Sequence, residues 1–138
     1  MNITLTDKIL DVLLLRPDQH DQDLWIDGGL SSFSSAGELI PEIAREPECG
    51  TTACIAGWTA LFSLPAGSVI DVRYNIRLPD GTLGFIPYWA RDALEITDEQ
   101  ADTLFYEIDT TEGAIRALKY LKDHPDAGED ELMDASGE

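Results

Sequence analysis

The sequence is short of positive charge. Of its 138 residues, 9 are Lys or Arg and 27 are Asp or Glu, which gives a formal net charge of −18 at pH 7. Proteins bind nucleic acids and anionic membranes through positive patches, so this balance argues against both kinds of partner. It favours basic partners instead. A plainer interpretation stays open, in which the charge only maintains solubility or reflects a high-salt host.

Long apolar segments are also missing. No apolar run approaches the roughly 20 residues that a helix needs to span a bilayer. The N-terminal segment has neither the basic start nor the small-residue cleavage site of a signal peptide, so we expect a cytoplasmic protein. The length fits one domain. We expect this globular domain to cover residues 1–124.

The segment CGTTACIAGW, residues 49–58, concentrates small residues, both cysteines and a large aromatic. The overlapping run 53–64 contains no charged side chain, which is typical of a helix buried on nearly every face. Thr51 or Thr52 would cap its N-terminus, and Pro65 would end it. The sequence therefore predicts a central apolar helix.

Most of the remaining chain has the periodicity or the caps of helices. The fold class that we predict is mainly α, of the α+β type, with about five helices packed around the central one. The clearest of these helices fall at residues 4–16, 88–95, 98–106 and 111–122. Thr97 and Gln100 have the spacing of a capping box at the start of the third. Residues 69–86 alternate β-forming and polar side chains around a Pro-Asp-Gly turn, which predicts a β-hairpin insertion. The segment 27–37, rich in Gly and Ser, predicts a loop. Residues 125–138 are acidic and lack Lys and Arg, which predicts a disordered tail.

Residues 49–58 also resemble the Cys-Gly-Thr-x-x-Cys-x-Ala-Gly-Trp signature of an uncharacterised family of small proteins from actinobacteria and their phages. The chain is similar to members of this family in residues 93–105, where a helix pair is joined at a Thr cap. It is similar again in an N-terminal helix that ends near Pro17, and in Trp25. The resemblance covers most of residues 4–122. Since no activity is established for the family, it implies no catalytic or binding residues. It implies an actinobacterial or phage origin, and with it a small modulator of host proteins.

Two cysteines and two histidines limit the thiol chemistry that the chain can support. Cys54 lies near the start of the predicted central helix, where the helix dipole would lower the pKa of a thiol, and His20 is a candidate base. This pair defines our alternative function, a thiol-dependent enzyme or redox protein. We favour the simpler interpretation that Cys54 packs as a small apolar side chain.

Three further sites in this segment are less favoured. Cys49 and Cys54 are close enough in sequence for a disulfide across a turn, but a reducing cytoplasm opposes it. A zinc site would need both cysteines with His20 and His124, and no CxxC or HxxxH spacing is present. The helix start after Gly50 resembles an anion site, but no Lys or Arg follows within the turn. We therefore expect no metal and no cofactor.

Carboxylates provide the larger set of candidates. Six of them cluster across two consecutive predicted helices and the connection between them: Asp98, Glu99, Asp102, Glu107, Asp109 and Glu112. None has the apolar surroundings that raise a pKa for acid catalysis, so we interpret them as solvated. Our first hypothesis is a non-enzymatic acidic binding protein that presents these carboxylates to a basic host protein as a nucleic-acid mimic. A third hypothesis is self-association through the N-terminal helix or the helix containing Trp89.

Overall fold

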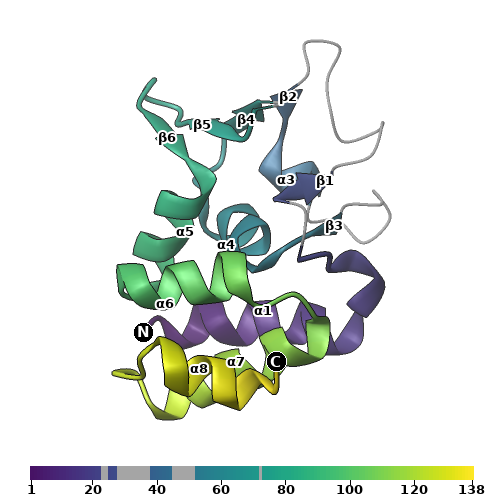
Figure 1. The fold of residues 1–138 in the computed structure, drawn as a ribbon. Coiled ribbons are helices and arrows are strands. Elements are labelled where there is room, and N and C mark those ends of the chain that lie inside the picture. The colour runs from purple at the N-terminus through teal and green to yellow at the C-terminus, as the bar shows by residue number, and fades with distance from the viewer. Residues whose placement is uncertain (23–24, 28–37, 45–51, 72) are drawn as a thin grey trace.

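The computed structural model describes residues 1–138 except 23–24, 28–37, 45–51 and 72 (Figure 1). The loop predicted at 27–37 therefore lies almost wholly outside the described residues, as do the candidate disulfide and anion sites that involve residues 49–51. The fold is α+β and mainly helical, with a small four-stranded antiparallel sheet. In Figure 1 the sheet lies at one end of the molecule and the helices are layered below it.

Helix α1 spans Ile3–Leu15 and supplies one side of the core. Asn2 caps its N-terminus, since the Leu5 amide donates to the Asn2 side chain at 3.1 Å. Its apolar residues recur at helical spacing, and the buried ones include Leu5, Ile9, Leu10 and Leu13. Pro17 cannot continue the helix, so a short 3-10 helix, η1 (Pro17–Gln19), follows. This agrees with the N-terminal helix predicted from the sequence.

Helix α4 spans Ile55–Ser63, and its first two turns are buried. Its N-cap is Cys54 instead of a threonine, because the two preceding residues form a strand, β3 (Thr52–Ala53). The indole Nε1 of Trp58 donates to the backbone carbonyl of Gln19 at 2.8 Å. This bond satisfies the one polar atom of a ring that is otherwise packed in the interior.

Strand β3 pairs with β1 (Ile26–Asp27) in a two-stranded antiparallel ladder. The larger sheet has the strand order β2-β4-β5-β6, and its strands lie at Glu38–Leu39, Val69–Asp71, Asn75–Arg77 and Leu83–Phe85. The short helix α3 (Pro41–Ala44) follows β2. Ile70 and Ile76 pair in register and are both buried, so they mark the face of the sheet that covers the core.

The segment 69–86 contains three strands, where the sequence predicted a two-stranded hairpin. The chain turns at Tyr74, whose φ of 65° places it in the left-handed region. Asp71 stabilises the turn, since its Oδ1 accepts from the amides of Arg73 at 2.8 Å and Asn75 at 3.0 Å. The alternation of side chains does not reveal this turn, because β-forming residues continue on both sides of it.

Helix α5 spans Ile86–Leu94 and packs against α4. A capping box then starts α6 (Asp98–Asp102): the Thr97 hydroxyl accepts from the Gln100 amide, and the Gln100 side chain accepts from the Thr97 amide. This cap is confirmed as the sequence predicted it. A π-helical turn, η3 (Thr103–Glu107), continues α6.

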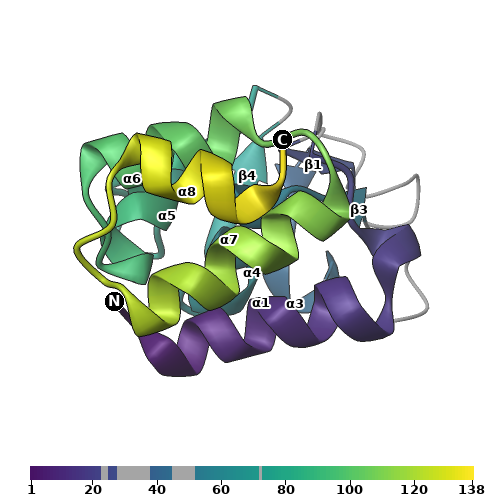
Figure 2. The ribbon, with the colours of Figure 1, turned by 60° about the horizontal axis from the view of Figure 1, so that its bottom comes forward.

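Helix α7 spans Thr111–Asp123, with Thr110 as its N-cap, and α8 spans Glu129–Ser136. The segment from residue 125, which the sequence predicted to be a disordered tail, is thus largely helical in the structure. Leu132 accounts for the difference, because its side chain is 0 % exposed and joins the core. Figure 2 shows α8 lying along α7 and beside α6.

Hydrogen bonds of two side chains connect the α8 segment to the rest of the molecule. Gln100 Nε2 donates to the carbonyls of Pro125 at 2.8 Å and Ala127 at 2.9 Å, in the connection before α8. The Glu138 carboxylate, which follows α8, accepts from two backbone amides that precede α7, at 2.8 and 2.9 Å. Charge alone therefore does not decide the conformation of this acidic segment.

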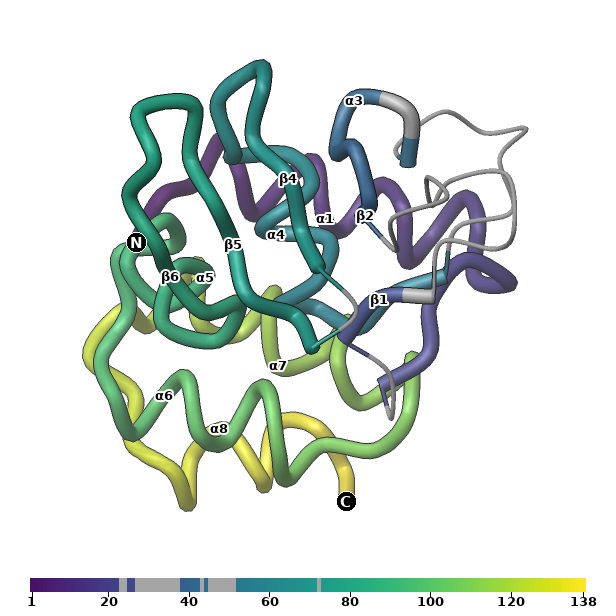
Figure 3. Tube along the Cα trace, turned by 90° about the horizontal axis from the view of Figure 1, so that it is seen from above, coloured from purple at the N-terminus to yellow at the C-terminus, as the bar shows by residue number. Residues whose placement is uncertain are grey.

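One continuous core extends from the sheet to α8. Seen from above, the strands of the larger sheet lie over α4 and α5, with α6, α7 and α8 beyond them (Figure 3). Within the described parts of the chain, no helix combines the length and the apolar character that crossing a membrane requires.

Candidate functional site

Cys54, the one thiol among the described residues, is 1 % exposed. Its Sγ accepts from the Gly57 amide at 3.5 Å and donates to the Trp25 carbonyl at 3.8 Å. Burial raises the pKa of the Cys54 thiol to about 11, and nearby amide hydrogen bonds oppose this shift only in part. At neutral pH the group is a protonated thiol, so the start of α4 does not activate it. This is the environment of a structural cysteine.

His20 belongs to a buried network that joins η1 to α7 and η3. Its Nδ1 is 2.8 Å from Thr111 Oγ1, and its Nε2 is 2.9 Å from Gln22 Oε1. Because Gln22 Nε2 donates to the Leu104 carbonyl, Gln22 Oε1 is the acceptor, and His20 carries its proton on Nε2. Burial lowers the pKa of His20, against smaller opposing effects of Gln22 and two nearby carboxylates. The imidazole is therefore neutral at pH 7.

The backbone brings His20 near Cys54 without forming a nucleophile and base pair. His20 makes an isolated parallel β-bridge with Ala53, the residue before Cys54. Its two ring nitrogens are, however, engaged by Thr111 and Gln22. No ring nitrogen is left in this arrangement to accept a proton from the thiol.

The structure separates the residues considered for zinc. Cys49 lies outside the described residues. The two histidines lie at opposite ends of α7, since His20 bonds to Thr111 at its start and His124 follows its last residue. His124 Nδ1 is 3.1 Å from the Tyr120 carbonyl. Across the residues that the structure describes, no three potential ligands cluster closely enough to hold a metal ion.

The six carboxylates selected from the sequence are all exposed. They lie on α6 (Asp98, Glu99, Asp102), on η3 (Glu107), in the following turn (Asp109) and in the first turn of α7 (Glu112). Asp98 is paired, since its carboxylate is 2.8 Å from the Arg91 guanidinium. Glu99 accepts from the first amide of α8 at 3.4 Å. Asp102 and Glu107 make no ion pair with any described residue.

Helix α8 adds carboxylates from the segment that was predicted to be a disordered tail. The pKa of Glu129 is raised, mainly by the charge of Glu107, with smaller effects of burial, Asp130 and Glu99. Side chains from α6, η3 and α8 are thus close enough to repel one another. We call the surface formed by Glu99, Asp102, Glu107, Glu129 and Asp130 the acidic face. Its elements, α6, η3 and α8, cover residues 98–107 and 129–136, neither of which contains Lys or Arg.

Exposed aromatic rings adjoin the acidic face. Tyr88 is 62 % exposed and Tyr106 is 58 % exposed. With Arg91, Asp98 and Asp102 they help to line a depression of about 240 Å³. The Arg91 guanidinium lies 5.4 Å from the centre of the Tyr88 ring and is also paired with Asp98. The chain itself therefore holds a guanidinium between an aromatic ring and a carboxylate, which is a favourable arrangement for arginine.

Neither ring was predicted from the sequence to belong to a site. The available signal was that Tyr88 and Tyr106 fall outside the inward-facing apolar positions of their helices. Tyr106 also lies in the π-helical turn η3, and π-helical turns are frequent at functional sites. Its ring makes an edge contact with Trp25, with 5.4 Å between the ring centres. Burial, Asp102 and Tyr88 raise the pKa of Tyr106, so these groups lie close together.

Comparison with known proteins does not add to this picture: no family model matches the chain, and no curated protein or solved structure matches it. The resemblance to small actinobacterial and phage proteins therefore stays a prediction. The geometry of the chain's own residues carries the functional argument.

Proposed function

We propose that this protein is a non-enzymatic binding protein that recognises a basic protein surface through its acidic face. The observation that carries the proposal is that exposed carboxylates from α6, η3 and α8 gather on one surface, where the Glu129 amide is 3.4 Å from the Glu99 carboxylate. The charge of Glu107 raises the pKa of Glu129, which agrees with this clustering. Like charges that approach across separate elements cost free energy in the isolated protein. A basic partner would relieve this repulsion, so the acidic face is suited to such a partner.

The rings beside the acidic face support the same function. Tyrosine is enriched at protein interfaces because it combines a large apolar area with a polar tip, and it is frequent among residues that dominate binding energy. Tyr88 and Tyr106 would form the anchor, with Asp102 as the carboxylate for an incoming arginine or lysine. The surrounding carboxylates would steer the partner and select against acidic proteins.

The biological setting belongs to the same proposal. We infer a phage-type modulator that acts in the host cytoplasm and occupies the nucleic-acid site of a host protein. The apolar helix α4 would act as the central scaffold and not as part of the site. The alternative function, thiol chemistry at Cys54, has weaker support, because that thiol is buried and His20 is fully engaged.

Capture from host lysate tests the proposal directly. The immobilised protein is incubated with lysate at low salt and again at high salt, and the retained proteins are identified by mass spectrometry. We expect a basic protein that is retained at low salt and released as the Debye length falls from about 10 Å at 0.1 M to about 3 Å at 1 M. A triple variant, Glu99→Gln, Asp102→Asn and Glu107→Gln, should lose it.

A matched variant separates the acidic face from total charge. Asp11→Asn, Asp18→Asn and Asp123→Asn also remove three exposed carboxylates, but from α1, η1 and the end of α7. We expect this variant to retain the partner. Equal loss in both variants, or recovery of no basic protein at either salt concentration, contradicts the proposal.

A further inference from the structure

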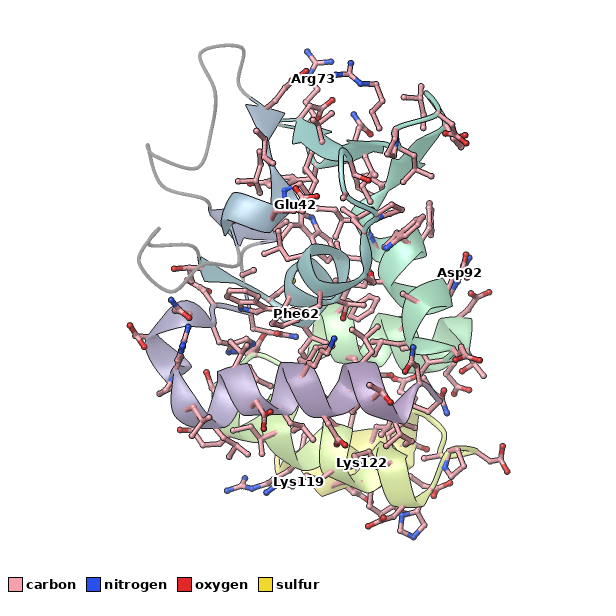
Figure 4. The ribbon with its side chains drawn as sticks, turned by 180° about the vertical axis from the view of Figure 1, so that it is seen from behind. Glu42, Phe62, Arg73, Asp92, Lys119 and Lys122 are labelled. Atoms are coloured by element: carbon pink, nitrogen blue, oxygen red, sulfur yellow. The ribbon has the colours of Figure 1, made fainter. Side chains whose placement is uncertain are left out.

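We propose that a second site, in the pocket between α1 and α4, binds a small aromatic monoanion such as an aromatic carboxylate. The pocket has a volume of about 420 Å³, and ligand pockets generally fall between about 300 and 1,000 Å³. Figure 4, seen from behind, has α1 in front and labels Phe62 between α1 and α4. This proposal does not depend on the acidic face, which is built from other elements.

The pocket offers flat apolar surface to a ligand. Phe62 is only partly buried and presents its ring to the pocket from α4. Behind it the buried ring of Trp58, which is 2 % exposed, stacks on Phe62 with 5.6 Å between ring centres and 28° between ring planes. The hydrogen bond from Trp58 Nε1 to the Gln19 carbonyl fixes the orientation of the indole. Val12 and Leu15 line the pocket from α1, and Leu15 is 78 % exposed. A planar aromatic body would therefore meet a surface that is already ordered.

The charged residues of the pocket specify the sign of the ligand. Lys8 and Arg16 both line it, about two helical turns apart along the chain. Neither makes an ion pair within the described residues. Asp11 is the one carboxylate in the lining, so the pocket has a net charge of +1, from two cations and one anion, in a chain of net charge −18. An anionic group is thus complementary to this place in particular.

The overall charge also limits the number of negative charges on the ligand. A polyanion such as a nucleic acid would extend beyond Lys8 and Arg16 into the negative field of the surrounding surface. A ligand with a single carboxylate or sulfonate would not extend into this field. The size of the pocket also favours a small ligand over a polymer. A neighbouring depression of about 250 Å³, which shares Lys8 and Phe62, gives room for one further substituent.

Isothermal titration calorimetry with naphthalene-2-carboxylate as the probe tests this site. We expect one molecule to bind per chain and the NMR signal of the Trp58 indole N–H to shift during the titration. Lys8→Gln or Arg16→Gln should weaken binding about tenfold, the scale of one charge-assisted hydrogen bond. The uncharged analogue naphthalene-2-methanol should bind more weakly by a similar factor.

Two control variants remove exposed cations elsewhere, Lys119→Gln on α7 and Arg73→Gln beside the β4–β5 turn; both residues are labelled in Figure 4. These controls should bind the probe as the parent protein does. Urea unfolding of all four variants verifies that each is folded. The proposal is overturned if the probe does not bind at millimolar concentration, if the controls weaken binding as much as Lys8→Gln and Arg16→Gln, or if the alcohol binds as tightly as the carboxylate.

Discussion

A methyl group on Gly57 would lie 1.7 Å from the carbonyl oxygen of Trp25. It would also come within 2.8 Å of the Ala53 side chain and 2.9 Å of Ile26. Helix α4 can therefore approach the β1 segment this closely only because residue 57 has no side chain. The Ala-Gly-Trp end of the conspicuous segment 49–58 thus has a packing explanation.

Gly57→Ala should destabilise the protein by about 3 kcal/mol, because overpacking a well-filled core costs about 1–3 kcal/mol and here the contact is with rigid backbone. Urea unfolding followed by circular dichroism measures the change. Gly84→Ala is the control, since a methyl group there would lie 3.9 Å from its nearest neighbour, Ile76, which is an ordinary contact. Equal stability of the two variants would show that the close approach of Gly57 and Trp25 is not rigid.

Slow alkylation is expected of Cys54. With a pKa of about 11, only about 10⁻⁴ of the thiol is ionised at pH 7. The side chain is also 1 % exposed, so reaction requires local or global unfolding. The measurement uses the Cys49→Ser variant, in which iodoacetamide can label Cys54 alone. Labelling should be slow in buffer and fast in denaturant, and rapid labelling of the folded protein at pH 7 would support the nucleophile hypothesis.

Glu138 should make stability depend on pH in the acid range. Partial burial raises its pKa, but hydrogen bonds from Thr110 and Asp109 outweigh this effect, and the net pKa lies below the ordinary 4.5. As pH falls, the unfolded state binds the proton first. The stabilisation is therefore present above about pH 4.5 and is lost as pH falls through the lower folded pKa.

Urea unfolding of Glu138→Gln at several pH values measures this contribution. The variant should be less stable than the parent at pH 7, and the difference should shrink below pH 4.5. Asp134→Asn serves as control, because Asp134 is an exposed carboxylate on the same helix, α8. A difference between Glu138→Gln and the parent that stays constant with pH would mean that the carboxylate does not act through its charge.

The effect of Glu129 on stability should depend on pH in the opposite sense to that of Glu138. Its pKa is raised, mainly by Glu107, so the folded state is penalised at pH values above that pKa, and the penalty is relieved as pH falls through it. Glu107→Gln should lower the pKa of Glu129 in an NMR titration of the carboxyl carbons. Asp18→Asn, far along the chain in η1, should leave it unchanged. An unaltered pKa in Glu107→Gln would mean that the acidic face is not assembled as described.

Features of this fold that depend on a few adjacent residues were predicted from the sequence more accurately than features that depend on long-range contacts. The Thr97 capping box and the end of α1 before Pro17 were predicted because each depends on a few adjacent residues. The turn at Tyr74 was not predicted. Hydrogen bonds to Asp71 stabilise its left-handed conformation, and the alternation of side chains gives no sign of them. Cys54 was placed inside the helix and is instead its cap, since pairing of β3 with β1 fixes the preceding residues.

The candidate site shows the same division. The exposed carboxylates of α6 and η3 could be read from the sequence, because helix spacing and capping place them. The place of Glu129 in the site could not be predicted, because long-range contacts hold α8 in place. Leu132 is buried in the core, and Gln100 and Glu138 make hydrogen bonds with residues far away in the sequence. An acidic segment with one buried leucine has the composition of a disordered tail, and only its tertiary contacts distinguish the two.

The central claim is that the conspicuous cysteine segment is scaffold and that recognition belongs to the acidic face. The most direct test is the dissociation constant of the captured basic partner for two variants of the protein. Cys54→Ser removes the thiol but keeps a capping oxygen, and the other variant is the Glu99→Gln, Asp102→Asn, Glu107→Gln triple substitution. We predict an unchanged dissociation constant for Cys54→Ser and a value raised about tenfold or more for the triple variant. Loss of binding in Cys54→Ser, with normal binding by the triple variant, would contradict the account.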